Sequence, residues 1–152
     1  MGADATPIFA GGPAEKDVLT ELSQRWRECQ ASLDGNSPRA AIILMGSLVE
    51  GALWVRAKRE VPPTVLFTAR SAPRTTQGNT KPLDEWSLES LIDVAAELDW
   101  ISKEQQKLGK IVRQYRNYVH PREAVKDQSE LSIRNAKMLW GVASGIVQHI
   151  LE

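Results

Sequence analysis

The chain is poor in the residues that hold metal ions and disulfide bonds. Its 152 residues include one cysteine, Cys29, and two histidines, His120 and His149. A single cysteine cannot form an internal disulfide bond, and two distant histidines do not have the spacing of a metal site. We therefore expect a protein that needs no structural disulfide, no metal ion and no other cofactor.

The chain also lacks net charge. Its 19 Lys and Arg residues balance 19 Asp and Glu residues, which gives a formal net charge of zero at pH 7. A protein without excess positive charge lacks the general attraction to phosphate that many nucleic-acid-binding proteins have. This balance excludes a generally adhesive RNA binder, but it leaves room for a focused anion-binding site.

Long apolar runs and a secretory signal are absent as well. The chain has no run of 18 apolar residues that would predict a membrane span. Its first residues lack the basic and apolar regions of a signal peptide. We therefore expect a cytoplasmic protein that does not bind a membrane. The composition, 42% hydrophobic and 25% charged, is that of a globular protein, and the length suits one domain.

Glycine and proline divide the chain into segments. Residues 1–13 contain three glycines and two prolines and predict a flexible N-terminal arm, followed by one helical domain over residues 14–152. Residues 61–83 contain four prolines. They predict a long loop, reaching to about residue 86, in which residues 64–70 form at most one short helix.

Hydrophobic periodicity predicts about five helices and no strand. The expected helices cover residues 14–34, 39–59, 87–98, 102–120 and 129–151. Ser87 and Ser102 have the position and chemistry of helix N-caps. Pro121 is expected to end the fourth helix at about His120, because the residue before a proline is disfavoured in the α region. The predicted fold class is an all-α helical bundle.

The helix at residues 39–59 is apolar on nearly all sides, which predicts a central and buried position. Gly46, Ser47 and Gly51 lower its helix propensity, so we expect them to allow the close approach of a neighbouring helix. Glu50 is expected to be buried within this run and therefore to need a positive partner. Arg113 or Arg116 is expected to neutralise it.

One flank of the helix at residues 102–120 gathers basic and polar side chains. At about 100° per residue, Arg113 and His120 differ by roughly 20° in azimuth and lie two turns apart. Arg116 and His120 form an i, i+4 pair. The flank consists of Lys103, Lys107, Lys110, Arg113, Arg116, Asn117 and His120. The other side of the helix is apolar and includes Leu108 and Ile111.

Two guanidinium groups beside an imidazole suit phosphoryl transfer on RNA. Histidine exchanges protons near neutral pH, so it can take a proton from a 2′-hydroxyl group or return one to a leaving oxygen. Arginine can hold a phosphate and stabilise charge that develops on it. Each assignment has a structural alternative: His120 could cap a helix C-terminus, and Lys107 and Lys110 could form a solvated face or bind RNA phosphates.

The residues of this flank resemble a known superfamily. The stretch Ile111-Val-Arg-Gln-Tyr-Arg-Asn-Tyr-Val-His-Pro121 follows an apolar helix that contains Gly46-Ser-Leu-Val-Glu-Gly51. Together these segments are similar to the HEPN (higher eukaryotes and prokaryotes nucleotide-binding) superfamily, and more narrowly to its bacterial branch with an Arg-Asn-x-x-His-Pro signature. The resemblance covers residues 37–150, and its specific part is residues 111–121.

The resemblance implies an α-helical bundle that commonly forms a homodimer. In active members, two Arg-x(4–6)-His motifs meet across the dimer and form a metal-independent endoribonuclease, often a toxin or a phage-defence effector. In this chain, His120 matches the histidine of the motif. Arg116 is followed by Asn117, as is common in the family, but only three residues separate it from His120. Arg113 has six intervening residues but is followed by Gln114.

These observations leave more than one function open. As an endoribonuclease, the protein would use His120 as general base or acid, with Arg113 and Arg116 on the scissile phosphate and Asn117 and Glu50 in support. Alternatively, it would be a non-catalytic scaffold or regulatory module in a defence or toxin–antitoxin complex, with a protein partner from the same operon. A third alternative is nucleotide binding without hydrolysis.

The zero net charge conceals a segregation of charge along the chain. Residues 82–102 contain six acidic and no basic residues, whereas residues 103–122 contain six basic residues against Glu104 alone. If these two helices pack against each other, their charges partly cancel, which would weaken the case for RNA binding. If the basic flank faces a cleft instead, this neutral protein has a local anion site.

Overall fold

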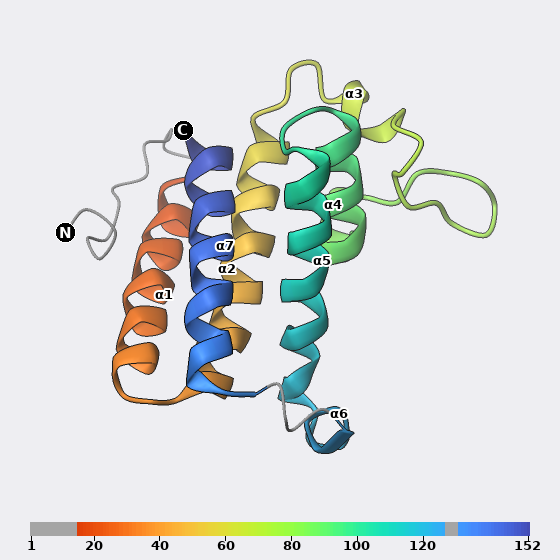
Figure 1. The fold of residues 1–152 in the computed structure, drawn as a ribbon. Helices are drawn as coiled ribbons and strands as arrows, with labels where there is room; N and C mark the ends of the chain where they lie inside the picture. The colour runs from red at the N-terminus through yellow and green to blue at the C-terminus, as the bar shows by residue number, and fades with distance from the viewer. Residues whose placement is uncertain (1–14, 127–130) are drawn as a thin grey trace.

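The computed structural model describes residues 15–126 and 131–152, which form an all-α bundle (Figure 1). The long helices are α1 (Lys16–Asp34), α2 (Pro38–Lys58), α4 (Leu88–Glu97), α5 (Lys103–Arg116) and α7 (Ile133–Leu151). The short elements are α3 (Thr64–Phe67), the 3-10 turns η2 (Leu83–Glu85) and η3 (Asn117–Val119), and α6 (Pro121–Lys126). In the described ranges there is no strand, only an isolated bridge between Arg74 and Thr80. The predicted fold class is confirmed, and the predicted arm at residues 1–13 lies outside the described residues.

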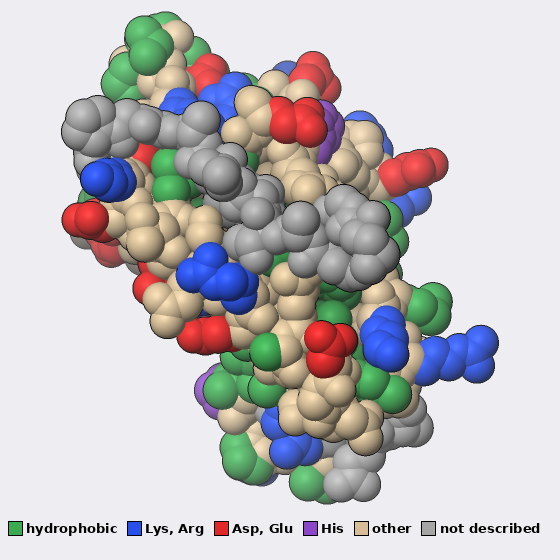
Figure 2. Space-filling model, turned by 90° about the vertical axis from the view of Figure 1, so that its left-hand side faces the viewer, with side chains coloured by type: hydrophobic (Ala, Val, Ile, Leu, Met, Phe, Trp, Pro, Cys, Tyr) green, Lys and Arg blue, Asp and Glu red, His purple; other side chains and the backbone are tan. Residues whose placement is uncertain are grey.

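The apolar helix α2 occupies the centre of the bundle, as its sequence predicts. It packs against α1, α7, α5 and α4. In Figure 1, α1 and α7 lie to one side of α2, and α4 and α5 lie to the other. Side chains on several sides of α2 are fully buried, among them Ile42, Met45, Leu48 and Leu53. The outer face that α1 presents mixes acidic and basic side chains, with no broad area of one sign (Figure 2).

α2 is also long and apolar enough to cross a membrane, judged by length and composition alone. It is the one such helix in the part of the chain that the structure describes, with 21 residues and a mean hydropathy of 1.5 over its best window. Of that window, 56% is buried inside the bundle. The core helix of a soluble protein meets the same criterion, so packing at the centre of the bundle accounts for this sequence.

Two glycines of α2 admit neighbouring side chains, as predicted. A β-carbon at Gly46 would lie 2.9 Å from the side chain of Arg116 on α5. A β-carbon at Gly51 would lie 2.5 Å from Cδ2 of Leu22 on α1. Real β-carbons do not approach other heavy atoms so closely. The absence of a side chain at these two positions therefore allows α5 and α1 to pack closely against different sides of α2.

The predicted N-caps are confirmed, but the end of α5 is not where the sequence placed it. The backbone N–H groups of Ser90 and Gln105 donate to the side chains of Ser87 and Ser102. α5 ends at Arg116, the turn η3 follows, and His120 has an extended backbone with φ −90° and ψ 117°. Proline keeps the preceding residue out of the α region and favours the first turn of a helix. The chain therefore leaves α5 before His120, and α6 begins at Pro121.

The long loop before α4 is held together by a ring contact and fixed to α4 by hydrogen bonds. The Phe67 ring meets the Trp86 ring edge-on at 6.0 Å between centroids. The Glu97 carboxylate accepts hydrogen bonds from the backbone N–H groups of Arg70 and Ser71 at 2.7 and 2.8 Å. Desolvation raises the pKa of Glu97, but the hydrogen bonds from Arg70 and Ser71 and the positive charge of Arg70 together lower it by more, so the pKa lies below its usual value.

Candidate functional site

The catalytic and supporting residues that the sequence predicted line one shallow pocket at the C-terminal end of α5. The pocket has a volume of about 360 Å³. Its polar lining consists of Glu50 from α2, Arg113 and Arg116 from α5, Asn117 and His120 from the turn after α5, and Ser87 before α4. Leu88 and Val119 complete it. The structure thus brings together all of the predicted catalytic and supporting residues.

Arg116 is the residue that neutralises Glu50. Its Nη1 lies 2.6 Å from Oε2 of Glu50, and the aliphatic part of the arginine rests over Gly46. The prediction that Glu50 is buried is wrong, because the two side chains are 38% and 39% exposed. Glu50 belongs to the side of α2 that faces the pocket, where solvent reaches it. Solvent screens this ion pair, so we expect it to contribute only about 0–1 kcal/mol to stability.

Arg113 faces an acidic residue of the neighbouring helix. Its Nη2 lies 3.5 Å from Oε2 of Glu89 on α4, and both side chains are substantially exposed. One turn earlier on α5, Nζ of Lys110 lies 2.9 Å from Oδ1 of Asp93, which is also on α4. The acidic segment and the basic segment therefore neutralise each other where α4 packs against α5, as the segregation of charge suggested.

The two lysines proposed for RNA phosphates lie outside the pocket. Lys110 is held by Asp93, and Lys107 is exposed; neither side chain lines the pocket. The pocket therefore gives no support to the RNA contacts proposed for these two lysines.

His120 is exposed at the rim of the pocket with its ring available. Its backbone N–H donates to the carbonyl of Asn117 at 3.0 Å. Within the described residues, no partner is hydrogen-bonded to the imidazole of His120 or to the side-chain amide of Asn117. The C-cap residue of α5 is Asn117, whereas His120 is the C-cap residue of η3 and makes the capping hydrogen bond with its backbone N–H rather than with its ring. The imidazole can therefore exchange a proton with a ligand in the pocket.

The start of α4 adds a feature that sequence reasoning did not assign to the site. Ser87, the N-cap of this helix, and Leu88, its first residue, both line the pocket. The first turn of a helix has backbone N–H groups without helical partners and carries a partial positive charge. The N-cap pattern at Ser87 was visible in the sequence, but its position beside α5 depends on the tertiary packing.

The remaining chemistry-bearing residues lie elsewhere. Cys29 is buried in the core, its Sγ–H faces the carbonyl of Ala41 at 3.4 Å, and burial raises its pKa to about 12. A thiol in this state is not a nucleophile at neutral pH. His149 is exposed on α7, with Nδ1 3.2 Å from Oε1 of Gln105. No group of three or more His, Cys, Asp or Glu residues in the described ranges is arranged to hold a metal ion.

The fold and the pocket together define an all-α bundle protein with an arginine–histidine pocket at the end of one helix. No family model, no curated protein and no solved structure matches the chain. The functional argument therefore depends on the geometry of this pocket and on the resemblance of residues 111–121 to the HEPN signature.

Proposed function

We propose that the protein is a HEPN-like, metal-independent endoribonuclease that acts as a cytoplasmic homodimer, of the kind found in toxin or phage-defence systems. The observation that carries this proposal is the pocket in which the imidazole of His120 stands beside the guanidinium groups of Arg113 and Arg116. The ring of His120 has no competing hydrogen bond within the described residues. The start of α4 gives the same pocket further preference for an anion.

The chemistry assigns one role to each group. His120 takes the proton from a 2′-hydroxyl group of RNA, and the freed oxygen attacks the adjacent phosphorus. The bond between phosphorus and the 5′-oxygen breaks, which leaves a 2′,3′-cyclic phosphate and a 5′-hydroxyl group. Arg113 and Arg116 stabilise the negative charge that develops on the phosphate, and Asn117 helps to position it. No metal ion takes part in these steps.

A second copy of the chain would supply the missing acid. The leaving 5′-oxygen needs a proton, and each pocket contains one histidine. His120 lies at an exposed rim, so His120 of a second copy facing the same phosphate would complete the pair of acid and base. This arrangement also follows from the resemblance to the HEPN superfamily.

The decisive experiment is incubation of the purified protein with single-stranded RNA in the presence of EDTA. We expect cleavage products that end in a cyclic phosphate, loss of cleavage in His120→Ala, and a strong reduction in Arg113→Gln and Arg116→Gln. The matched control is His149→Ala, which removes the other histidine far from the pocket and should leave cleavage intact. Cleavage that survives in His120→Ala, or that disappears with EDTA, would contradict the proposal.

A second candidate function is a non-catalytic module, and the ion pairs of the pocket favour it. Both arginines already face protein carboxylates, Glu50 and Glu89, and this lowers their attraction for RNA. Such a module would act as a scaffold or regulator in a defence or toxin–antitoxin complex, or would bind a nucleotide without cleaving it. RNA that stays intact, together with co-purification of a protein from the same operon or thermal stabilisation by a nucleotide, would support this alternative.

A further inference from the structure

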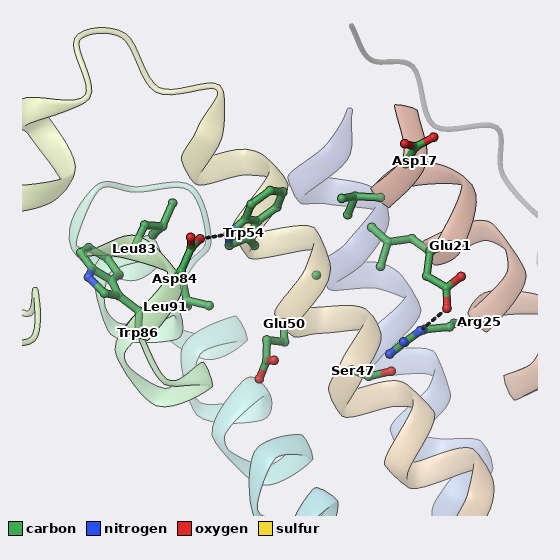
Figure 3. Close-up of a pocket in the computed structure, with 13 residues that line it drawn as sticks. Asp17, Glu21, Arg25, Ser47, Glu50, Trp54, Leu83, Asp84, Trp86 and Leu91 are labelled. Atoms are coloured by element: carbon green, nitrogen blue, oxygen red, sulfur yellow. Dashed lines mark hydrogen bonds and ion pairs between the residues drawn. The ribbon is translucent and has the colours of Figure 1, made fainter. Parts of the chain in front are cut away.

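A second and larger hollow lies on the opposite side of Glu50 from the arginine–histidine pocket. This groove has a volume of about 540 Å³ and lies over α2, with α1 on one side and η2 and the start of α4 on the other (Figure 3). Its volume falls within the range of about 300–1,000 Å³ that is typical of sites for small organic molecules. No feature of a single sequence segment predicts it, because its walls come from three separate parts of the chain.

The base and walls of the groove are apolar and aromatic. Leu22 of α1 packs over Gly51 at its base, Trp54 extends from α2 toward Asp84, and Trp86 lies between η2 and α4 (Figure 3). Nε1–H of Trp54 donates to Oδ1 of Asp84 at 3.2 Å, and Nε1–H of Trp86 donates to the carbonyl of Lys81 at 2.9 Å. Both indole N–H groups are therefore already used, so the rings offer a ligand only their apolar edges and faces.

The polar rim of the groove is strongly acidic. It has four carboxylates, from Asp17, Glu21, Glu50 and Asp84, against the single guanidinium of Arg25. Arg25 is taken by Glu21 at 3.1 Å, and Glu50 by Arg116 of the neighbouring pocket. Asp17 and Asp84 have no ion-pair partner among the residues that the structure describes. An anion would be repelled here, whereas a cation would be attracted.

Trp54 lies between a cation and a carboxylate. The ammonium group of Lys58 lies over its ring, 5.0 Å from the centroid. The negative face of an indole ring attracts cations, most strongly where water is partly excluded. Lys58 already holds this ring face, so the attraction for a ligand amine comes from the carboxylate of Asp84 at the edge of the ring.

We propose that this groove binds an organic cation in which a protonated amine is joined to an aromatic body, with the ring against the apolar side chains of Leu22 and Trp54 and the amine at Asp84. The proposal does not depend on ribonuclease activity, because it needs no cleavage chemistry from the arginine–histidine pocket. It commits to a small arylalkylamine: the groove accommodates one aromatic body between its walls and offers unpaired carboxylates at its rim.

The test uses tryptamine as the probe, with neutral N-acetyltryptamine and anionic indole-3-propionate as matched ligands. The five tryptophans of the chain each give an indole N–H signal in a two-dimensional ¹H–¹⁵N NMR spectrum, assigned with Trp→Phe variants. We expect tryptamine to shift the signals of Trp54 and Trp86 with a Kd in about the millimolar range. We expect N-acetyltryptamine to bind at least about threefold more weakly than tryptamine. With indole-3-propionate, we expect the signal shifts not to reach saturation.

A charge variant with a matched control completes the test. Asp84→Asn keeps an oxygen acceptor for Trp54 but removes the charge, and we expect it to raise the Kd for tryptamine by about two- to fivefold. Glu85→Gln makes the same charge change on the next, exposed residue outside the groove and should leave the Kd unchanged. The proposal is overturned if the three ligands bind equally, if other tryptophans respond instead, or if both variants behave alike.

Discussion

A β-carbon on Gly46 would lie 2.9 Å from Cβ, Cγ and Cδ of Arg116, so α5 crosses α2 where α2 has no side chain. From this crossing the guanidinium group reaches Glu50, one turn further along α2. The glycine thus determines how closely α5 approaches, and with it the position of Arg116 in the pocket.

Gly46→Ala should therefore destabilise the protein although alanine is the better helix former. Overpacking of this contact costs about 1–3 kcal/mol, because the clash includes Cβ of Arg116, which cannot move without its backbone. The gain in helix propensity offsets about 1 kcal/mol of this cost. We expect a net loss of about 1 kcal/mol in the free energy of unfolding, measured by urea denaturation.

Gly141→Ala is the matched control for that substitution. Gly141 lies in α7, and a β-carbon added there would have no heavy atom within 4 Å. Only the better helix propensity of alanine remains, so we expect the free energy of unfolding to rise by about 0.5–1 kcal/mol. Equal effects of the two substitutions would show that the approach of Arg116 does not constrain α2.

The ion pair between Glu50 and Arg116 should contribute little to stability. We expect a double-mutant cycle with Glu50→Gln and Arg116→Gln to give a coupling free energy of about 0.2–1 kcal/mol, because both side chains are more than a third exposed. The coupling should fall as salt is added. A coupling of about 3 kcal/mol would indicate a buried pair instead.

Removal of the carboxylate that faces Arg113 should strengthen anion binding in the pocket. Glu89→Gln releases Arg113 from its only ion-pair partner in the described chain. We expect the affinity for a short RNA to rise by about two- to fivefold, measured by fluorescence anisotropy on the His120→Ala background to prevent cleavage. Glu104→Gln makes the same charge change at an exposed site outside the pocket. An equal rise in both variants would mean that only overall charge matters.

The loop before α4 should loosen in acid. Because the pKa of Glu97 is lowered in the folded protein, its contribution to stability is present above the unfolded value of about 4.3 and disappears as the pH falls through the folded value. The backbone N–H groups of Arg70 and Ser71 should then exchange faster with solvent, relative to their intrinsic rates, below about pH 4. In Glu97→Gln, this dependence on pH should be absent; if it persists, another group is responsible.

Sequence reasoning worked where a property belongs to one helix or to neighbouring residues. The apolar character of α2 predicted its central position, and the unusual Glu50 and Gly46 predicted a charged partner and a close neighbour, which Arg116 supplies in both cases. The charge segregation between residues 82–102 and 103–122 left open either mutual neutralisation or a basic flank facing a cleft, and the ion pairs between α4 and α5 show the first.

It was less successful where the outcome depends on how the elements pack. The periodicity of α5 placed Leu108 and Ile111 on an apolar side, yet they are 37% and 40% exposed, because the line that faces the core passes through Gly109 and Val112. The helical spacing of Arg116 and His120 fails because η3 intervenes, although the turn returns His120 to the same pocket. The acidic groove combines three distant segments, so local patterns could not predict it.

Glu50 lines both the arginine–histidine pocket and the acidic groove, so we expect binding at the two sites to be thermodynamically linked. A cation bound at Asp84 also attracts the Glu50 carboxylate, which weakens its hold on Arg116 and leaves the guanidinium freer to hold an anion. Linkage is reciprocal, so an anion in the pocket must raise the affinity for the cation by the same factor. Titration of tryptamine with and without inorganic phosphate measures that factor, and a value of one would show that the sites are independent. With Glu50→Gln the linkage should vanish, because one side chain would carry all of the cooperativity.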